Sequence, residues 1–320
     1  MKYVTRRIGH SLLLLFGVSL LCFLFSDLAP GTFYDEMRLN PQISPETVAA
    51  LKSHAALDRP LPVRYLHWVR SAVSGEFGYS FAYNSPVAPL LAIRIRNTLI
   101  LTSLSTLLVW LIALPLGMWA AARPRGWPSR LTLPFSSFLH SIPELVLVLV
   151  LLALAVRSGA LPVGGMVSAG FSELSIFGKA VDFLRHLAIP LTVLTAGALP
   201  LVFRHIRSSF VDVLEAPYLR AAAGHGIGPV RLLVRHALLA AANPLISLFG
   251  LSIGGLLSGS LLVEVATGWP GIGPLLLNAT MDRDLYVVIG AVIASTVLMI
   301  VGNLLADFML IAVDPRIRTE

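Results

Sequence analysis

The sequence predicts an all-α membrane protein that crosses the bilayer six times. Hydrophobic residues make up 56% of its 320 positions, only 13% are charged, and the mean hydropathy is +0.80. Soluble domains average about 45–50% apolar and about 25% charged residues. Several apolar runs reach the roughly 20 residues that a helix needs to cross about 30 Å of hydrocarbon. Because lipid offers the backbone no hydrogen-bond partner, we expect these runs to be helices.

The first predicted transmembrane helix occupies residues 1–29. Three basic side chains precede its apolar run, Ile8–Phe25. This run is longer than the core of about 7–15 apolar residues in a signal peptide, so we expect an uncleaved helix. Residues 30–96 are polar and contain seven prolines, and we expect them to form an extracytoplasmic insertion.

The remaining spans form a predicted five-helix core, residues 97–312, followed by a cytoplasmic tail, residues 313–320. The fourth span of the chain is the least regular because it contains Pro190 and Pro200. The five expected spans of the core cover residues 99–121, 133–156, 187–203, 244–263 and 286–312.

Basic residues assign the sides of the membrane. Arginine and lysine collect in the short segments 1–7, 122–132, 204–243 and 313–320, which hold few acids. Cytoplasmic loops carry such an excess in membrane proteins, so we expect both termini in the cytoplasm. The net charge of +7 therefore reflects these loops and gives no reason to expect nucleic acid as a partner. The basic residues concerned are Lys2, Arg6, Arg7, Arg123, Arg125, Arg130, Arg204, Arg207, Arg220, Arg231, Arg235, Arg316 and Arg318.

The predicted cytoplasmic loop 204–243 contains a helix, a turn and a second helix. Three alanines from Ala221 onwards favour helix, and Gly224 and Gly226 end it. Pro229 suits the first position of the second helix, which carries basic residues. Two interpretations fit this pattern: a surface that receives another protein, or a helix that rests in the lipid head groups.

Motifs along most of the chain resemble those of ABC-importer permeases, in the peptide and nickel branch. Arg220-Ala221-Ala222 stands at the position of that family's EAA loop, and Gly226 stands at its glycine. The further matching segments are Leu57–Ser80, Ser85–Val87, "LPLGMWAA" at 114–121, "SIP" at Ser141–Pro143, "HAL" at His236–Leu238, Pro244, "WPGIG" at Trp269–Gly273, "RDLYVV" at Arg283–Val288 and "DPRIR" at Asp314–Arg318.

The resemblance implies the pore subunit of an importer in a bacterial or archaeal plasma membrane. It implies four kinds of partner contact: a second permease, two cytoplasmic ATPases, an external solute-binding protein and membrane lipid. It also implies that residues 218–231 form a coupling helix that sits on an ATPase, and that the solute is a peptide or a related small solute such as a nickel chelate. The coupling residues implied are Tyr218, Arg220, Ala221, Ala222, Gly224, Gly226 and Arg231.

The chain lacks the residues needed to bind ATP by itself. None of its three lysines lies in a G-x-x-x-x-G-K-[ST] pattern, so we expect no cofactor in this chain and place ATP and Mg²⁺ on partner subunits. The alternative function is a secondary transporter driven by an ion gradient, which would need no ATPase.

Three polar residues within predicted spans are candidate functional groups. Glu144 either lines the translocation path, contacts the partner permease or is a hydrated structural carboxylate. Asn303 and Asp307 lie four residues apart and share one helix face, where they either pair with a neighbouring span or a basic loop or line the translocation path.

Catalytic and metal sites are not expected. The eight histidines show no H-E-x-x-H or similar spacing. An intramembrane hydrolase would need a histidine at the depth of Ser258 and Ser260, and no span offers one. Small residues at those positions are expected to serve helix packing.

Overall fold

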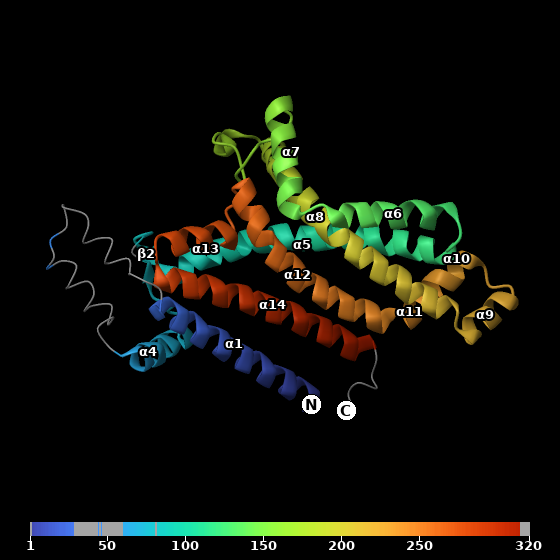
Figure 1. Cartoon of the computed structure of the whole chain (residues 1–320), viewed down its shortest axis with the longest axis horizontal. Coiled ribbons are helices and arrows are strands. Elements are labelled where there is room, and N and C mark those ends of the chain that lie inside the picture. The colour runs from blue at the N-terminus through green and yellow to red at the C-terminus, as the bar shows by residue number, and fades with distance from the viewer. Residues whose placement is uncertain (1, 29–43, 45, 47–59, 81, 314–320) are drawn as a thin grey trace. The chain divides into compact units, whose positions relative to one another are not determined.

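The computed structural model describes residues 2–28, 44, 46, 60–80 and 82–313 (Figure 1). Its contacts divide the chain into two compact units. Unit 1 comprises Met1–Tyr3, Leu99–Trp269 and Met299–Glu320, and unit 2 comprises Val4–Thr98 and Pro270–Leu298. The helices and strands in chain order are α1 (Lys2–Leu28), α4 (Leu61–Val73), β1 (Tyr79–Ser80), β2 (Ser85–Pro86), α5 (Val87–Ala122), α6 (Trp127–Ser141), α7 (Glu144–Ser158), η1 (Phe171–Glu173), α8 (Ile176–Leu214), α9 (Pro217–Gly224), α10 (Pro229–Arg231), the π-helical segment η2 (Leu232–Ala237), α11 (Leu238–Ala240), α12 (Ala242–Thr267), α13 (Ile272–Met281) and α14 (Leu285–Val313).

In unit 2, an aromatic cluster joins α1 to α4. The ring of Phe23 lies 5.3 Å from that of Tyr65 and 5.2 Å from that of Trp68. Ile289 of α14 packs into the same cluster. The hydroxyls of Ser19 and Tyr65 share a hydrogen bond of 2.9 Å, so the polar end of the tyrosine is satisfied while its ring is buried.

A buried carboxylate fixes the short β1–β2 hairpin of unit 2. Asp284 accepts hydrogen bonds from the hydroxyl of Ser80 at 2.7 Å and from the N–H of Ala82 at 3.3 Å. The Ser80 hydroxyl in turn accepts from the N–H of Tyr83 at 3.0 Å. These bonds tie the last part of the predicted insertion to the residue that precedes α14.

The helix α13 is fastened to α5 within unit 2. The side-chain amide of Asn97 donates to the carbonyl of Pro270 at 2.9 Å, and the N–H of Ile272 donates to the hydroxyl of Thr98 at 2.9 Å. With ten residues, α13 is about 15 Å long and too short to cross a bilayer.

In unit 1, α5, α8 and α12 enclose one apolar core, and glycines let the helices approach. A methyl group on Gly117 of α5 would come within 2.7 Å of Ile206 of α8. Gly250 of α12 faces Ala306 of α14, where the corresponding distance is 2.5 Å. The core residues of this region are Val109, Ala113, Ala120, Ala121, Val202, Phe203, Ile206, Phe210, Leu219, Ala237, Ala241, Leu245 and Leu248.

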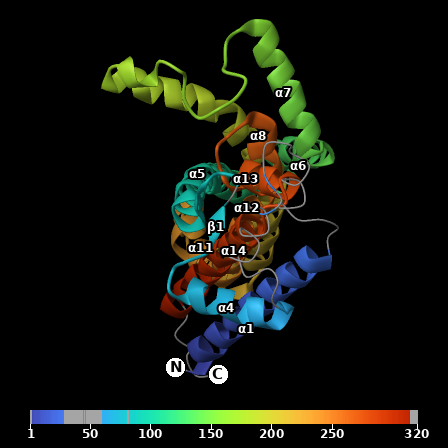
Figure 2. The ribbon, with the colours of Figure 1, turned by 90° about the vertical axis from the view of Figure 1, so that its left-hand side faces the viewer.

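The membrane spans agree with the predicted fold class, with one difference. Among the described residues, five helices are long and apolar enough to span: α5, α8, α12, α14 and the stretch Arg6–Phe25 of α1. The third predicted span, 133–156, is not a single helix. It falls on α6 and α7, which meet at an angle of 90° (Figures 1 and 2). Each of the two has 15 residues and is about 22 Å long, so neither crosses about 30 Å alone.

The break between α6 and α7 has a local cause in the sequence Ser141-Ile142-Pro143. The ring of a proline disfavours helical geometry in the residue before it. Ile142 accordingly takes φ −87° and ψ 117°, and Pro143 takes φ −60° and ψ 137°. Glu144 then starts α7, so the carboxylate stands at the bend.

Helix α8 runs through both of its prolines. It spans 39 residues, about 58 Å, where a span of residues 187–203 is expected. Pro190 and Pro200 are buried in helix contacts, and membrane helices tolerate proline when neighbours satisfy the freed backbone. The hydroxyl of Ser136 and the guanidinium of Arg204 both donate to the carbonyl of Pro200, at 3.4 Å and 3.3 Å. These two bonds hold the carbonyl of Pro200 itself, from α6 and from within α8, whereas the carbonyl freed by the missing N–H is that of residue 196.

Candidate functional site

A small projection lies at one end of unit 1, where the chain leaves α8 and returns to α12. It consists of α9, the turn His225–Gly228, α10 and η2, and we call these residues, 217–237, the knob (Figure 1). Proline stands at the first position of both α9 and α10, where its missing N–H costs nothing. The predicted helix ending at Gly224 and the predicted helix start at Pro229 are both confirmed.

The knob is anchored by one leucine. Leu219 of α9 is 1% exposed and belongs to the same core as Phe210 of α8 and Ala237 of η2. The second helix of the loop, which begins at Pro229, contains a π-helical stretch from Leu232 to Ala237. The wider π turn belongs to the segment against which α9 packs.

The turn between the two helices depends on Gly226. This residue has φ +84°, a conformation that a residue with a side chain rarely adopts. Its N–H donates to the carbonyl of Ala223 at 3.0 Å, and the N–H of Ile227 donates to that of Ala222 at 3.4 Å. Apart from its chain neighbours, no described atom lies within 4 Å of a methyl group placed on Gly226. The turn therefore presents bare backbone to the outside.

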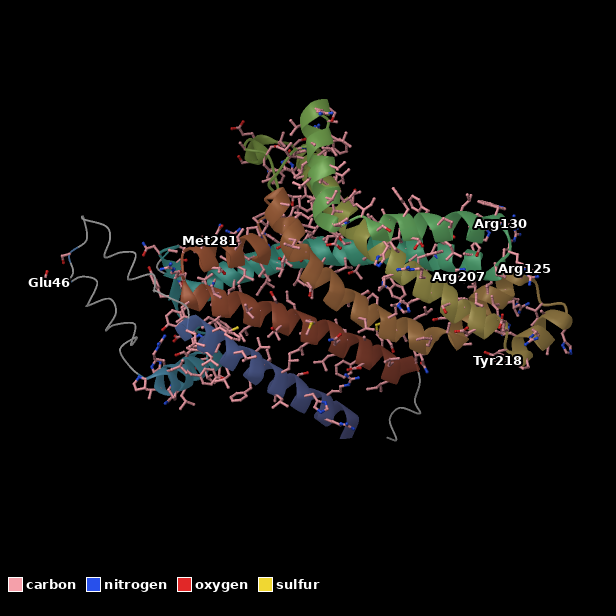
Figure 3. All side chains as sticks on the ribbon, in the orientation of Figure 1. Glu46, Arg125, Arg130, Arg207, Tyr218 and Met281 are labelled. Carbon is pink, nitrogen blue, oxygen red and sulfur yellow. The ribbon has the colours of Figure 1, made fainter. Side chains whose placement is uncertain are left out.

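The other residues expected at this surface lie on it too. Tyr218 is 57% exposed (Figure 3), and Ala221, Gly224 and Arg231 are exposed, whereas Ala222 is half-buried. Arg220 is exposed, and its guanidinium donates two hydrogen bonds to the carbonyl of Glu215, at 2.9 Å and 2.5 Å. That arginine holds the start of α9 against the end of α8.

The sequence alone gives no sign of two further exposed apolar residues, Val230 at 73% and Val234 at 54%. Only the structure shows that they extend the knob's surface beyond α9. An apolar and small-residue surface with basic edges is suited to contact with a protein.

The three polar span residues lie in two places of unit 1. Asp307 is buried, and the side-chain oxygen of Asn303 lies 3.9 Å from the position of a methyl group on Gly250. Asn303 therefore faces α12, and Asp307, four residues later, lies on the same side of α14. Glu144 lies apart, at the start of α7, and its carboxylate reaches Gly197 of α8 and Gly259 of α12.

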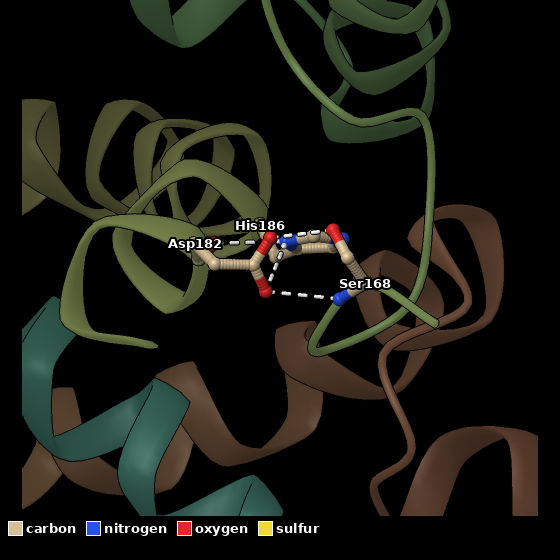
Figure 4. A network of polar contacts seen from close by, with 3 residues as sticks. All are labelled: Ser168, Asp182 and His186. Carbon is tan, nitrogen blue, oxygen red and sulfur yellow. Dashed lines mark hydrogen bonds and ion pairs between the residues drawn. The ribbon is translucent and has the colours of Figure 1, made fainter. Parts of the chain in front are cut away.

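A serine of the loop before α8 meets an aspartate and a histidine of α8, but not as a catalytic triad (Figure 4). The carboxylate of Asp182 accepts from the hydroxyl and the N–H of Ser168, at 2.5 Å and 2.9 Å. His186 Nδ1 lies 2.8 Å from the carbonyl of Asp182 and 3.6 Å from its carboxylate. Since the serine bonds the carboxylate and not the imidazole, the cluster fastens the loop to α8 and does not activate a nucleophile.

Unit 1 thus combines helices of membrane-spanning length with a helix–turn–helix that projects at one end. Residues 113–319 match the family described as "Binding-protein-dependent transport system inner membrane component". Residues 1–102 match the family that describes the N-terminal part of such membrane components. The chain belongs to this family of ABC importer permeases, in its dipeptide and oligopeptide branch.

Relatives match the chain over almost its whole length. The oligopeptide transport system permease protein AppB of Bacillus subtilis is 36% identical over 98% of both chains. The glutathione transport system permease protein GsiC of Escherichia coli (strain K12) is 32% identical over 99% of both. A chain of the MetNI methionine ABC transporter in inward-facing conformations has the same fold, with a TM-score of 0.54 at 18% identity, covering 70% of this chain and 96% of that one.

Proposed function

We propose that this chain is the pore subunit of an ATP-driven importer for peptides or related small solutes, coupled to its ATPase through the knob. The observation that carries the proposal is the Gly226 turn, whose bare backbone is open to a partner while Leu219 holds it to the core of α8 and η2. Small side chains permit close backbone approach, and a buried anchor transmits movement of the knob to a span.

The assembly that we propose has four further subunits. Two cytoplasmic ATPases contribute ATP and Mg²⁺, a second and homologous permease completes the pore, and an external binding protein delivers the solute. The knob, the α5–α6 corner and both termini lie on the cytoplasmic side of the inner membrane, and residues 30–96 lie outside. The basic residues of the loops support this orientation.

A peptide is the solute class that the relatives favour. AppB carries "oligopeptide" in its name, and GsiC carries "glutathione", itself a tripeptide. Solutes of this class share amide groups and a charged amine. The same class is proposed for this chain.

Reconstitution tests the proposal. The chain is purified with its partner permease, ATPases and binding protein, inserted into liposomes, and assayed for uptake of a labelled tripeptide. We expect uptake that requires ATP and survives an ionophore that collapses ion gradients. Uptake by the permeases alone that the ionophore abolishes would instead identify a secondary transporter and overturn the proposal.

A further inference from the structure

The carboxylate of Glu144 occupies a place made by glycines on two other helices. A methyl group on Gly197 of α8 would overlap Glu144 Oε1 and come within 3.0 Å of its Cγ and Cδ. On Gly259 of α12, a methyl group would lie 3.2 Å from Oε2. Neither glycine has a positive φ, so both are required for space and not for backbone conformation. Two glycines far from Glu144 in the sequence thus leave the space that its side chain occupies.

The surface beside this carboxylate is more polar than a lipid-facing helix surface. The exposed stripe of α12 begins and ends with leucines, Leu251 at 71% and Leu262 at 60% exposed. Between them it consists of Gly255 and Ser258, which are also exposed, and Gly259 follows directly. Small and hydroxylated residues in the middle of a span suit close helix packing, and beside a half-buried acid they also suit contact with water.

The charge of Glu144 is not compensated within the described residues, where the carboxylate has neither an ion pair nor a hydrogen bond. An acid inside a membrane is costly unless it meets water or a positive group. A metal ion is a poor fit, since no group of three or more His, Cys, Asp or Glu residues occurs in the described part of the chain. An ammonium group needs only one carboxylate, with which it forms charge-assisted hydrogen bonds.

We propose that Glu144 is a specificity-determining residue of the translocation path and receives the ammonium group of the solute between α7, α8 and α12. This inference rests on the proposed function, because it assumes that a solute passes the bend of α6 and α7. The negative charge is held half-buried at the bend, where a passing cation pairs with it for a short time. Because Gly197 and Gly259 carry no side chains, the carboxylate has room to lie against the backbones of α8 and α12.

A matched pair of peptides tests this role in the reconstituted importer. Trialanine has a free ammonium group, and N-acetyl-trialanine lacks it. Glu144→Gln keeps the size of the side chain and removes its charge, so we expect uptake of trialanine to fall about tenfold while uptake of the acetylated peptide stays within about twofold. Glu173→Gln, which removes an exposed acid in η1, is the control and should leave both rates unchanged.

Two glycine variants sharpen the test. Gly259→Ala places a methyl group against Oε2 and should reproduce part of the selective loss, whereas Gly17→Ala, in open space on α1, should not. If Glu144→Gln leaves trialanine uptake unchanged, or lowers uptake of both peptides equally, the carboxylate is structural and the inference is wrong.

A substrate-independent measurement separates this inference from the proposed function. If the wild-type importer takes up neither peptide, the peptide assignment fails. Reaction of Glu144→Cys, with Cys22→Ser, towards a water-soluble cationic thiosulfonate then decides whether position 144 lines the path. Rapid labelling in the assembled importer supports the path, and the absence of labelling overturns it.

Discussion

Gly78 and Gly226 adopt similar backbone conformations in opposite surroundings. Gly78 has φ +101°, and a methyl group placed on it would lie 2.8 Å from Cγ of Tyr286. Gly226 has φ +84°, and the same construction meets no described atom within 4 Å beyond its chain neighbours. The first turn is packed by its own chain. The second also needs a positive φ, but no part of the described chain packs against it.

This difference separates a structural glycine from a contact glycine. At Gly78 the lack of a side chain serves packing in unit 2, next to the hairpin that Asp284 holds. At Gly226 no internal neighbour demands a glycine for space. The φ angle explains why glycine is favoured at position 226. The absence of packed neighbours among the described residues leaves the backbone of this turn accessible to a partner protein.

The largest effect is expected from Gly226→Trp. The indole would cover the bare turn, so we predict that the ATPase no longer co-purifies and that uptake falls at least about a hundredfold, the scale of a lost central contact. The matched control is Gly75→Trp, since Gly75 has φ +87° and equally open space. It carries the same backbone strain but should retain the ATPase. Equal loss in both variants would mean that strain, not contact, is responsible.

Gly78→Ala should act in the opposite way. Left-handed backbone strain and overlap with the first ring atom of Tyr286 should destabilise unit 2 by about 4 kcal/mol. Thermal unfolding in detergent measures the change. Among molecules that remain folded, co-purification of the ATPase should be unaffected. If the variant kept normal stability but lost the ATPase, the claim that Gly78 serves packing and Gly226 serves partner contact would be wrong.

A smaller and more local effect is expected from Leu219→Ala. Removing the buried anchor should cost about 3 kcal/mol in the contacts of α9, so its amides should exchange with solvent faster than those of α8. ATP hydrolysis would then continue with weaker coupling to uptake. Leu239→Ala is the control, because Leu239 is 69% exposed on the neighbouring helix. Unchanged exchange in α9 would show that the leucine does not hold the knob.

The sequence predicted the spans better than their geometry. Hydropathy located every membrane-length segment, because bilayer thickness sets their length. It did not predict the 90° break, although Ile142-Pro143 contains its cause, since a proline can also be accommodated in a continuous helix. Pro190 and Pro200 in α8 are the example. The difference between these prolines depends on packing from other helices, which a single sequence does not contain.

The knob was predicted in outline from its alanines, glycines and prolines. Its anchor was not, because Leu219 is one leucine among many and only the fold shows that it enters the core. The fit of Glu144 between Gly197 and Gly259 was equally inaccessible. Residues 144, 197 and 259 lie on three helices, and no spacing rule connects them. The predicted tail motif at Asp314–Arg318 and residues 30–43, 45, 47–59 and 81 of the insertion lie outside the described residues.

Photo-crosslinking at position 218 tests the central claim most directly. A benzoylphenylalanine in place of the exposed Tyr218 is activated in the assembled importer, and the same group in place of the exposed Tyr79 of unit 2 is the reference. We predict an adduct with the ATPase from position 218 and none from position 79. Absence of that adduct from 218 in a complex that hydrolyses ATP and transports would contradict the assignment of the knob as the coupling surface.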